Sequence, residues 1–194
     1  GSMAARPDVA MGYAACEAAL QGNPIQEGNV GAGTGCTIGK IRGPQYAMKG
    51  GLGTCAYRQG DLMVGAVMAC NAMGDVVEDG TILAGARNDD NTGFAGTEEW
   101  LIQHSQRQRD IFSGKLVGEN TVIGCVVTNA ALNKAQAAKL AAVAQNGIAR
   151  AVRPANATFD GDSLFAMCHG TVPADPDAVG ILAARAVEEA IRRG

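Results

Sequence analysis

The chain has 194 residues, of which 47% are hydrophobic and 18% are charged. This size and apolar content predict one packed domain and exclude an intrinsically disordered chain. The net charge is −3 and no basic stretch is interleaved with aromatic residues, so nucleic-acid binding is disfavoured. No apolar run is as long as a membrane span and no signal-peptide pattern opens the sequence, so we expect a cytoplasmic protein without a membrane partner.

The first 60 residues predict one helix followed by irregular structure. Residues 1–3, Gly-Ser-Met, resemble a remnant of cloning and are set aside. Residues 8–20 carry an apolar pattern with helical spacing. Residues 28–60 contain ten glycines, which indicates turns and short strands lining a surface.

The next segment predicts β-structure. Residues 62–70 are almost entirely apolar, and residues 76–84 place Asp79-Gly80 between residues with β-propensity, as in a two-residue hairpin. We therefore expect adjacent antiparallel strands. Residues 88–120 are polar and lack clear periodicity apart from residues 98–102, which predicts a mobile connection.

The second half predicts, in order, a strand over residues 121–128, a helix over 134–145, a strand over 164–168 and a helix over 175–193. Both strands are apolar on each face, which is typical of strands covered on both sides. Asn133 and Gln136 form a capping-box pattern before the first helix, and Gly147 suits its end. The order of elements indicates stacked sheets between helical layers.

Cysteine and histidine give little sign of a metal site. The six cysteines are far apart and form no CxxC pair, so we expect reduced thiols. The two histidines, His104 and His169, belong to no motif with metal-ligand spacing. We therefore expect no metal. A catalytic device based on Ser-His-Asp or Cys-His would need one of these two histidines.

The glycine-rich segment 31–40 resembles a phosphate-binding loop at first sight. The P-loop pattern fails because Thr34 stands where glycine is needed and Ile41 follows Lys40 in place of Ser or Thr. Two interpretations stay open, a set of tight turns and a cleft lined by backbone.

Thr121 directly follows the polar stretch 118–120 and opens a buried strand. A threonine in this position is ordinary in a β-strand. If the Asn120–Thr121 bond is cut, however, Thr121 carries both a hydroxyl and an α-amine with an ordinary pKa of about 7.7–8. One residue would then supply the nucleophile and its base. The cut itself can be intramolecular, through attack of the Thr121 hydroxyl on the Asn120 carbonyl.

Several motifs occur together along most of the chain: Gly12 to Ala19, Gly28 to Gly35 with Gly39-Lys40, Gly50 to Thr54, Asn71 to Asp75, Asn120-Thr121, Val126 to Ala130, and Asp160-Gly161-Asp162. In this order they resemble the DmpA-type L-aminopeptidase/D-esterase family of self-cleaving N-terminal-nucleophile hydrolases. The resemblance implies an α/β fold, an α/β/β/α sandwich incomplete at its N-terminus. It also implies one domain divided by self-cleavage into residues 4–120 and 121–194, and assembly into homo-oligomers.

The resemblance also implies roles for five residues. Thr121 corresponds to the nucleophile, and Asn71 to an asparagine whose amide donates to the oxyanion. Lys40 corresponds to a lysine near the nucleophile, while Asp160 and Asp162 correspond to positions that orient it. At i and i+2 on an extended segment, the two carboxylates point to one side, so one of them can have a raised pKa. Without the family, the same residues are interpreted as a turn asparagine, a solvated lysine and an Asp-Gly-Asp turn.

This sequence also departs from the family, whose members usually carry a long region before the segment represented by residues 8–20. A second chain could supply that region. The function implied is hydrolysis of small peptides or amino-acid amides without a cofactor. Two alternatives remain, an inactive fragment with a structural or partner-binding role and an acyltransferase similar to the ornithine acetyltransferases.

Overall fold

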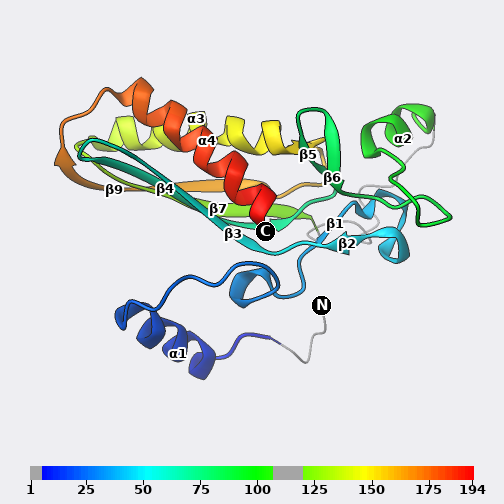
Figure 1. Ribbon diagram of the computed structural model, residues 1–194, viewed down its shortest axis with the longest axis horizontal. Coiled ribbons are helices and arrows are strands. Elements are labelled where there is room, and N and C mark those ends of the chain that lie inside the picture. The colour runs from blue at the N-terminus through cyan, green and yellow to red at the C-terminus, as the bar shows by residue number, and fades with distance from the viewer. Residues whose placement is uncertain (1–5, 107–119) are drawn as a thin grey trace.

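The body of the protein is a four-stranded sheet with two long helices on one face (Figure 1). The computed structural model describes residues 6–106 and 120–194. The sheet order is β3 (Leu52–Gln59), β4 (Leu62–Asn71), β7 (Thr121–Ala130) and β9 (Ser163–Val172). Strand β4 pairs antiparallel with both β3 and β7, and β9 runs parallel to β7. The covering helices are α3 (Lys134–Ala151) and α4 (Pro176–Arg193).

Shorter elements surround this body. A three-stranded sheet joins β6 (Thr81–Ala84), β5 (Asp75–Glu78) and β8 (Val152–Arg153), and a two-stranded sheet joins β1 (Thr37–Ile38) and β2 (Met48–Lys49). Single-turn helices span Gly31–Gly33, Lys40–Arg42 and Pro44–Tyr46. Two further helices are α1 (Val9–Leu20) and α2 (Thr97–Gln103). The turns and short strands predicted for residues 28–60 are confirmed, except that β3 is a full eight-residue strand.

The predicted hairpin is confirmed, but its relation to the preceding strand is not. Asp79 and Gly80 have φ values of 47° and 81°, as a two-residue turn between β5 and β6 requires. Strand β4, however, pairs with β3 and β7, and the hairpin belongs to another sheet. The prediction that the strand over residues 62–70 lies beside the hairpin was wrong, because β4 pairs on that side with β7, which lies far away in the sequence.

Local capping predicts where the helices begin, while packing decides how α3 ends. Met11 N donates to the Asp8 carboxylate at 2.8 Å, and the capping box that begins α3 is present. The predicted end at Gly147 is wrong because α3 continues to Ala151. A Cβ atom on Gly147 would lie 2.3 Å from the carbonyl oxygen of Ala184, so the glycine allows α4 to pack closely. No helix in the described ranges is both long and apolar enough to cross a membrane.

One face of the main sheet and the inner sides of α3 and α4 form the core. The predicted apolar stripe of α4 is confirmed. Fully buried members of this core include Val64, Met68, Val122, Val126, Ile148, Val179, Val187 and Ile191. Burial of such side chains stabilises the fold by roughly 1.5–3 kcal/mol each.

The opposite face of the main sheet is exposed. Ile123 and Val127 of β7 are 44% and 47% exposed, and Phe165 and Met167 of β9 are 61% and 63% exposed. The prediction that both strands are covered on each side is therefore wrong for the described residues. The exposed apolar side chains of β7 and β9 form a contiguous surface, and surfaces of this kind commonly pack against another protein.

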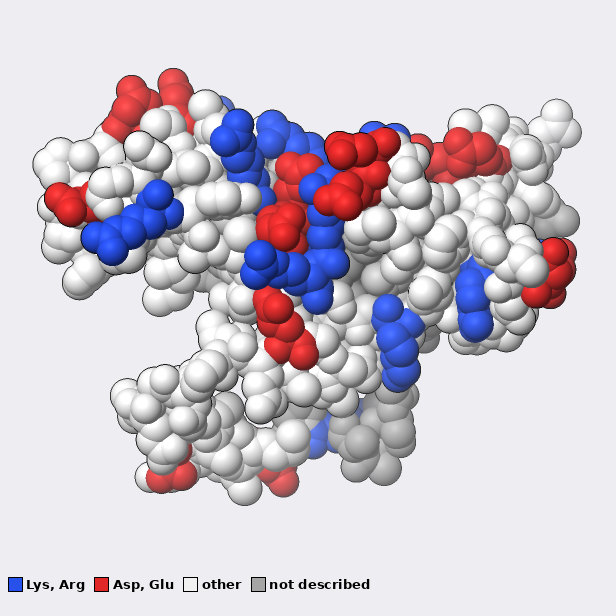
Figure 2. All heavy atoms as spheres, in the orientation of Figure 1, with Lys and Arg blue, Asp and Glu red and all other residues white. Residues whose placement is uncertain are grey.

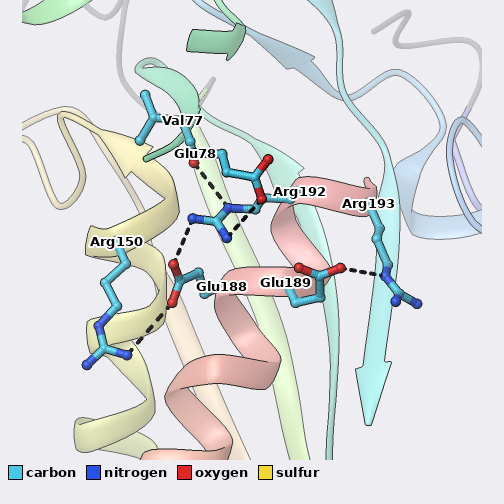
Figure 3. A network of polar contacts seen from close by, with 7 residues as sticks. All are labelled: Val77, Glu78, Arg150, Glu188, Glu189, Arg192 and Arg193. Carbon is cyan, nitrogen blue, oxygen red and sulfur yellow. Dashed lines mark hydrogen bonds and ion pairs between the residues drawn. The ribbon is translucent and has the colours of Figure 1, made fainter. Parts of the chain in front are cut away.

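Charged side chains join α4 to its neighbours (Figure 3). Arg192 bonds the Val77 carbonyl and pairs with Glu188 at 2.7 Å and with Glu78 at 3.3 Å. Glu188 also meets Arg150 of α3 at 3.7 Å. Figure 2 shows this mixed band of acidic and basic side chains over the C-terminal part of α4, so no large field of one sign forms there.

We predict that Gly147→Ala destabilises the protein by about 1–3 kcal/mol, because the added methyl group must push α4 away from α3. The matched control is Gly12→Ala in α1, where a Cβ atom meets nothing within 4 Å. That change should be neutral or stabilising by up to about 1 kcal/mol, since alanine favours helices over glycine. Urea unfolding of both variants measures the difference, and equal stabilities would contradict the packing explanation.

Candidate active site

The candidate site lies where β4 ends and β7 begins. Asn71 and Thr121 are direct partners in the antiparallel register. Because side chains alternate along strands, both residues belong to the sheet face opposite α3 and α4. A cavity of about 270 Å³ opens there. Its lining combines both strands with the glycine-rich segment: Ala32, Thr34, Gly35, Cys36, Ala69, Asn71, Thr121 and Ile123.

The glycine-rich segment forms one wall of this cavity, so both interpretations of it hold. Gly31, Gly35 and Gly39 have positive φ, as tight turns require. Gly33 is buried and packs so closely that a Cβ atom would lie 2.3 Å from the backbone nitrogen of Leu52. The segment is therefore held against β3 at Gly33, while Ala32 and residues 34–36 line the cavity.

Lys40 fixes the side chain of Asn71. Lys40 Nζ donates to the backbone oxygen and to Oδ1 of Asn71, each at 2.8 Å, and Thr37 N donates to the same Oδ1 at 3.0 Å. The amide oxygen thus faces Lys40, and Nδ2 occupies the other branch of the side chain. Lys40 is half-buried, which rules out its interpretation as a solvated lysine. Asn71 is the last residue of β4, which rules out its interpretation as a turn asparagine.

The two aspartates hold backbone groups around the start of β7. Asp162 accepts from Val122 N at 2.7 Å and from Asn156 N at 3.0 Å. Asp160 Oδ2 accepts from Ala157 N at 2.9 Å, whereas its buried Oδ1 has no hydrogen-bond partner among the described residues. Burial raises the pKa of Asp160 and the neighbouring carboxylate of Asp162 raises it further. The predicted raised pKa of one member of the pair is confirmed.

Thr121 contacts the carbonyl that precedes it. Thr121 Oγ1 donates to the backbone oxygen of Asn120 at 2.5 Å. Gly161 N donates to the same oxygen at 3.0 Å, as part of an isolated parallel bridge between Asn120 and Asp160. Asn120 is only 5% exposed. A hydroxyl and a backbone carbonyl are thus held together in a site that is largely shielded from water.

Some site residues were missed at the level of sequence. Thr37, Asn156 and Gly161 act through backbone N–H groups, which leave no mark in the choice of side chain. The segment 107–119 of the predicted mobile connection lies outside the described residues. In the part of the connection that is described, α2 exceeds the short periodic stretch that we predicted.

Neither histidine lines the cavity. His104 stacks on Trp100 with a centroid distance of 4.0 Å, and His169 is exposed on β9. All six cysteines are free thiols, and no cluster of three or more metal-ligating side chains occurs in residues 6–106 and 120–194.

The sequence matches the model of peptidase family S58 over residues 3–194. The chain belongs to peptidase family S58. This confirms the resemblance to the DmpA-type hydrolases.

Relatives within family S58 are similar over nearly all of this chain but are longer. An uncharacterized aminopeptidase of Mycobacterium leprae is 34% identical over 92% of this chain and 48% of its own length. A 6-aminohexanoate-oligomer endohydrolase of Paenarthrobacter ureafaciens is 29% identical over 86% of this chain and 46% of its own. The chain spans about half the length of these relatives.

Solved structures show the same fold over the matched part. A beta-aminopeptidase of Burkholderia sp. has a TM-score of 0.58 and 23% identity, covering 88% of this chain and 46% of its own. The L-aminopeptidase D-Ala-esterase/amidase of Ochrobactrum anthropi has a TM-score of 0.57 and 24% identity, covering 88% and 45%. The mixed α/β architecture of family S58 is therefore present, with about half of each solved chain matched.

We predict that Asp160→Asn flattens part of the pH dependence of stability. Because burial holds the pKa of folded Asp160 above its unfolded value, stability falls as the pH rises from the unfolded to the folded pKa. The variant lacks this loss and should gain stability relative to wild type over that window. Urea unfolding between pH 3 and 7 measures the difference, with Asp61→Asn in the exposed β3–β4 turn as control. A difference between Asp160→Asn and wild type that does not change with pH would contradict the effect of burial.

Proposed function

We propose that this chain carries the catalytic centre of an autoprocessing amide or ester hydrolase that is cut between Asn120 and Thr121, with Thr121 as nucleophile. The contact of Thr121 Oγ1 with the Asn120 carbonyl, at 2.5 Å, is the observation that carries the proposal. Membership of family S58 and the cavity beside Thr121 support it.

The first step of self-cleavage needs only groups that are already in contact. Thr121 Oγ1 attacks the Asn120 carbonyl carbon through a five-membered ring, and the hydroxyl proton passes to the Thr121 nitrogen. The C–N bond then breaks and leaves an ester between Asn120 and the Thr121 side chain. Water hydrolyses this ester to the Asn120 carboxylate and a terminal Thr121 with free hydroxyl and amine. The fixed approach of the two groups replaces a bimolecular encounter.

In the cut protein, the new amine of Thr121 serves as its base. Its ordinary pKa of about 7.7–8 allows it to accept a proton near neutral pH. The ammonium of Lys40, bound to Asn71 directly opposite Thr121, favours the neutral amine. The Asn71 amide nitrogen donates to the oxyanion, a role typically worth about 2.7–4 kcal/mol. Asp160 and Asp162 orient the first residues of β7.

The two products stay together. Strand β4 lies before the cut and pairs with β7 after it from Val64↔Thr128 to Asn71↔Thr121. Residues 4–120 and 121–194 are thus two portions of one domain whose shared sheet survives cleavage. The exposed apolar face of the main sheet fits the association, with further copies or with a second chain, that the sequence predicts.

Small peptides and amino-acid amides are the substrates that we propose. Relatives are named as aminopeptidases and as an endohydrolase of 6-aminohexanoate oligomers, so amide bonds are common to both. The cavity of about 270 Å³ accommodates one or two small residues at the nucleophile. We propose that the reaction uses only groups of the protein and water, without a cofactor, and that the protein functions in the cytoplasm.

We predict that Thr121→Ala abolishes both the cut and turnover, because the variant lacks the hydroxyl that attacks in each reaction. Thr121→Ser keeps that hydroxyl and should retain both. Intact mass under denaturing conditions detects two fragments that meet between residues 120 and 121. One uncut species in the unaltered protein would support the inactive fragment instead, and turnover by the alanine variant would direct attention to the histidines.

We predict that water, not an amine, takes the acyl group. The protein is incubated with an amino-acid amide, with and without an added acceptor amine, and the products are identified by mass. The free acid should form at the same rate in both mixtures. Predominant transfer to the acceptor would support the acyltransferase alternative.

A further inference from the structure

We propose that the backbone N–H of Gly161 is the donor that stabilises the oxyanion during self-cleavage at Asn120, an inference that rests on the proposed function. Gly161 N lies 3.0 Å from the carbonyl oxygen that would take the negative charge. In the described residues this oxygen also accepts from Thr121 Oγ1. That second bond is lost when Oγ1 turns to attack the carbon, whereas the bond from Gly161 remains.

The direction of this N–H is fixed on both sides. Before it, Asp160 is bonded twice to Ala157, through Asp160 N to the Ala157 oxygen and through Ala157 N to Asp160 Oδ2, each at 2.9 Å. After it, the carboxylate of Asp162 accepts hydrogen bonds from Val122 N and Asn156 N. A donor held in this way needs no reorganisation when charge develops, which is the condition for effective oxyanion stabilisation.

Burial strengthens the effect. Asn120 is 5% exposed, so water competes little for its carbonyl oxygen. In such surroundings a hydrogen bond to a developing negative charge is stronger than it is in water. The low exposure therefore makes a single backbone donor sufficient to change the rate substantially.

The absence of a side chain at position 161 fits the same role. A Cβ atom on Gly161 would lie 3.0 Å from Thr121 Oγ1 and 3.7 Å from the Asn120 oxygen. Glycine thus allows the donor to approach the carbonyl while the hydroxyl keeps the freedom to move. Position 161 therefore requires a residue without a side chain, and the contacts of Asp160 and Asp162 alone do not explain this requirement.

During the reaction the π electrons of the Asn120 carbonyl move onto its oxygen as the Oγ1–C bond forms. The Gly161 N–H donates to this oxygen and keeps its own proton. When the C–N bond breaks, the carbonyl reforms in the ester and the Thr121 nitrogen holds the proton from the hydroxyl. Gly161 lowers the barrier without undergoing any covalent change.

Replacing the 160–161 peptide bond with an ester removes this N–H and adds no side chain. The full chain can be assembled by ligation at Gly124–Cys125 and Met167–Cys168, with glycolic acid in place of Gly161 in the synthetic segment. Cleavage is timed by intact mass after refolding, against the unmodified chain assembled in the same way. The control carries the same ester at Gly80 in the exposed β5–β6 turn, within a synthetic segment 70–124 that is joined at Ala69–Cys70.

We expect the ester at 161 to slow cleavage by about 100–1000-fold and the ester at 80 to leave the rate unchanged. If the unmodified chain cuts and the ester at 161 cuts within threefold of it, the role of Gly161 is overturned while the proposed function stands. Equal slowing by both esters also overturns the role of Gly161. An unmodified chain that stays whole overturns the proposed function, and the inference falls with it.

A second measurement examines the bond without altering the backbone. In uncut Thr121→Ala, a scalar coupling across the hydrogen bond should connect the Gly161 nitrogen to the Asn120 carbonyl carbon in NMR spectra. Absence of this coupling, with couplings present across the β4–β7 ladder, would contradict the proposed contact.

Discussion

The pairing of β4 with β7 is the constraint on which the site depends. It joins segments on either side of residue 120 and ends in the pair Asn71 and Thr121. Because the ladder is antiparallel, the last residue of one strand meets the first residue of the other. An asparagine held by Lys40 is therefore set opposite a threonine whose hydroxyl touches the preceding carbonyl.

The two faces of the main sheet have different tasks. One face packs on α3 and α4 and supplies most of the buried side chains. The other face carries the cavity and an exposed apolar surface. A rigid core on one side allows the strand ends on the other side to hold polar groups at fixed distances, which preorganised catalysis requires.

Local hydrogen bonding explains which elements could be predicted. Asp8, the capping box of α3 and the Asp79-Gly80 turn act over two to four residues, so their patterns are legible in the sequence. The predicted helix end at Gly147 was wrong because glycine, which often ends helices, is also the residue that a close helix crossing requires. The predicted neighbours of β4 were wrong because its partner β7 is about 60 residues away in the sequence.

By itself, the sequence determined the approximate positions of α1, β4, the β5–β6 hairpin, β7 and α4, and the start of α3. Through the resemblance to a family, it also nominated Lys40, Asn71, Thr121, Asp160 and Asp162. Only the tertiary structure decided that these five residues gather at one end of the sheet and that Asp160 is buried enough to raise its pKa. It also decided that backbone N–H groups hold several of the polar groups of the site. The physical reason is that residue type encodes local propensity, whereas burial and the direction of an N–H group depend on segments far apart in the chain.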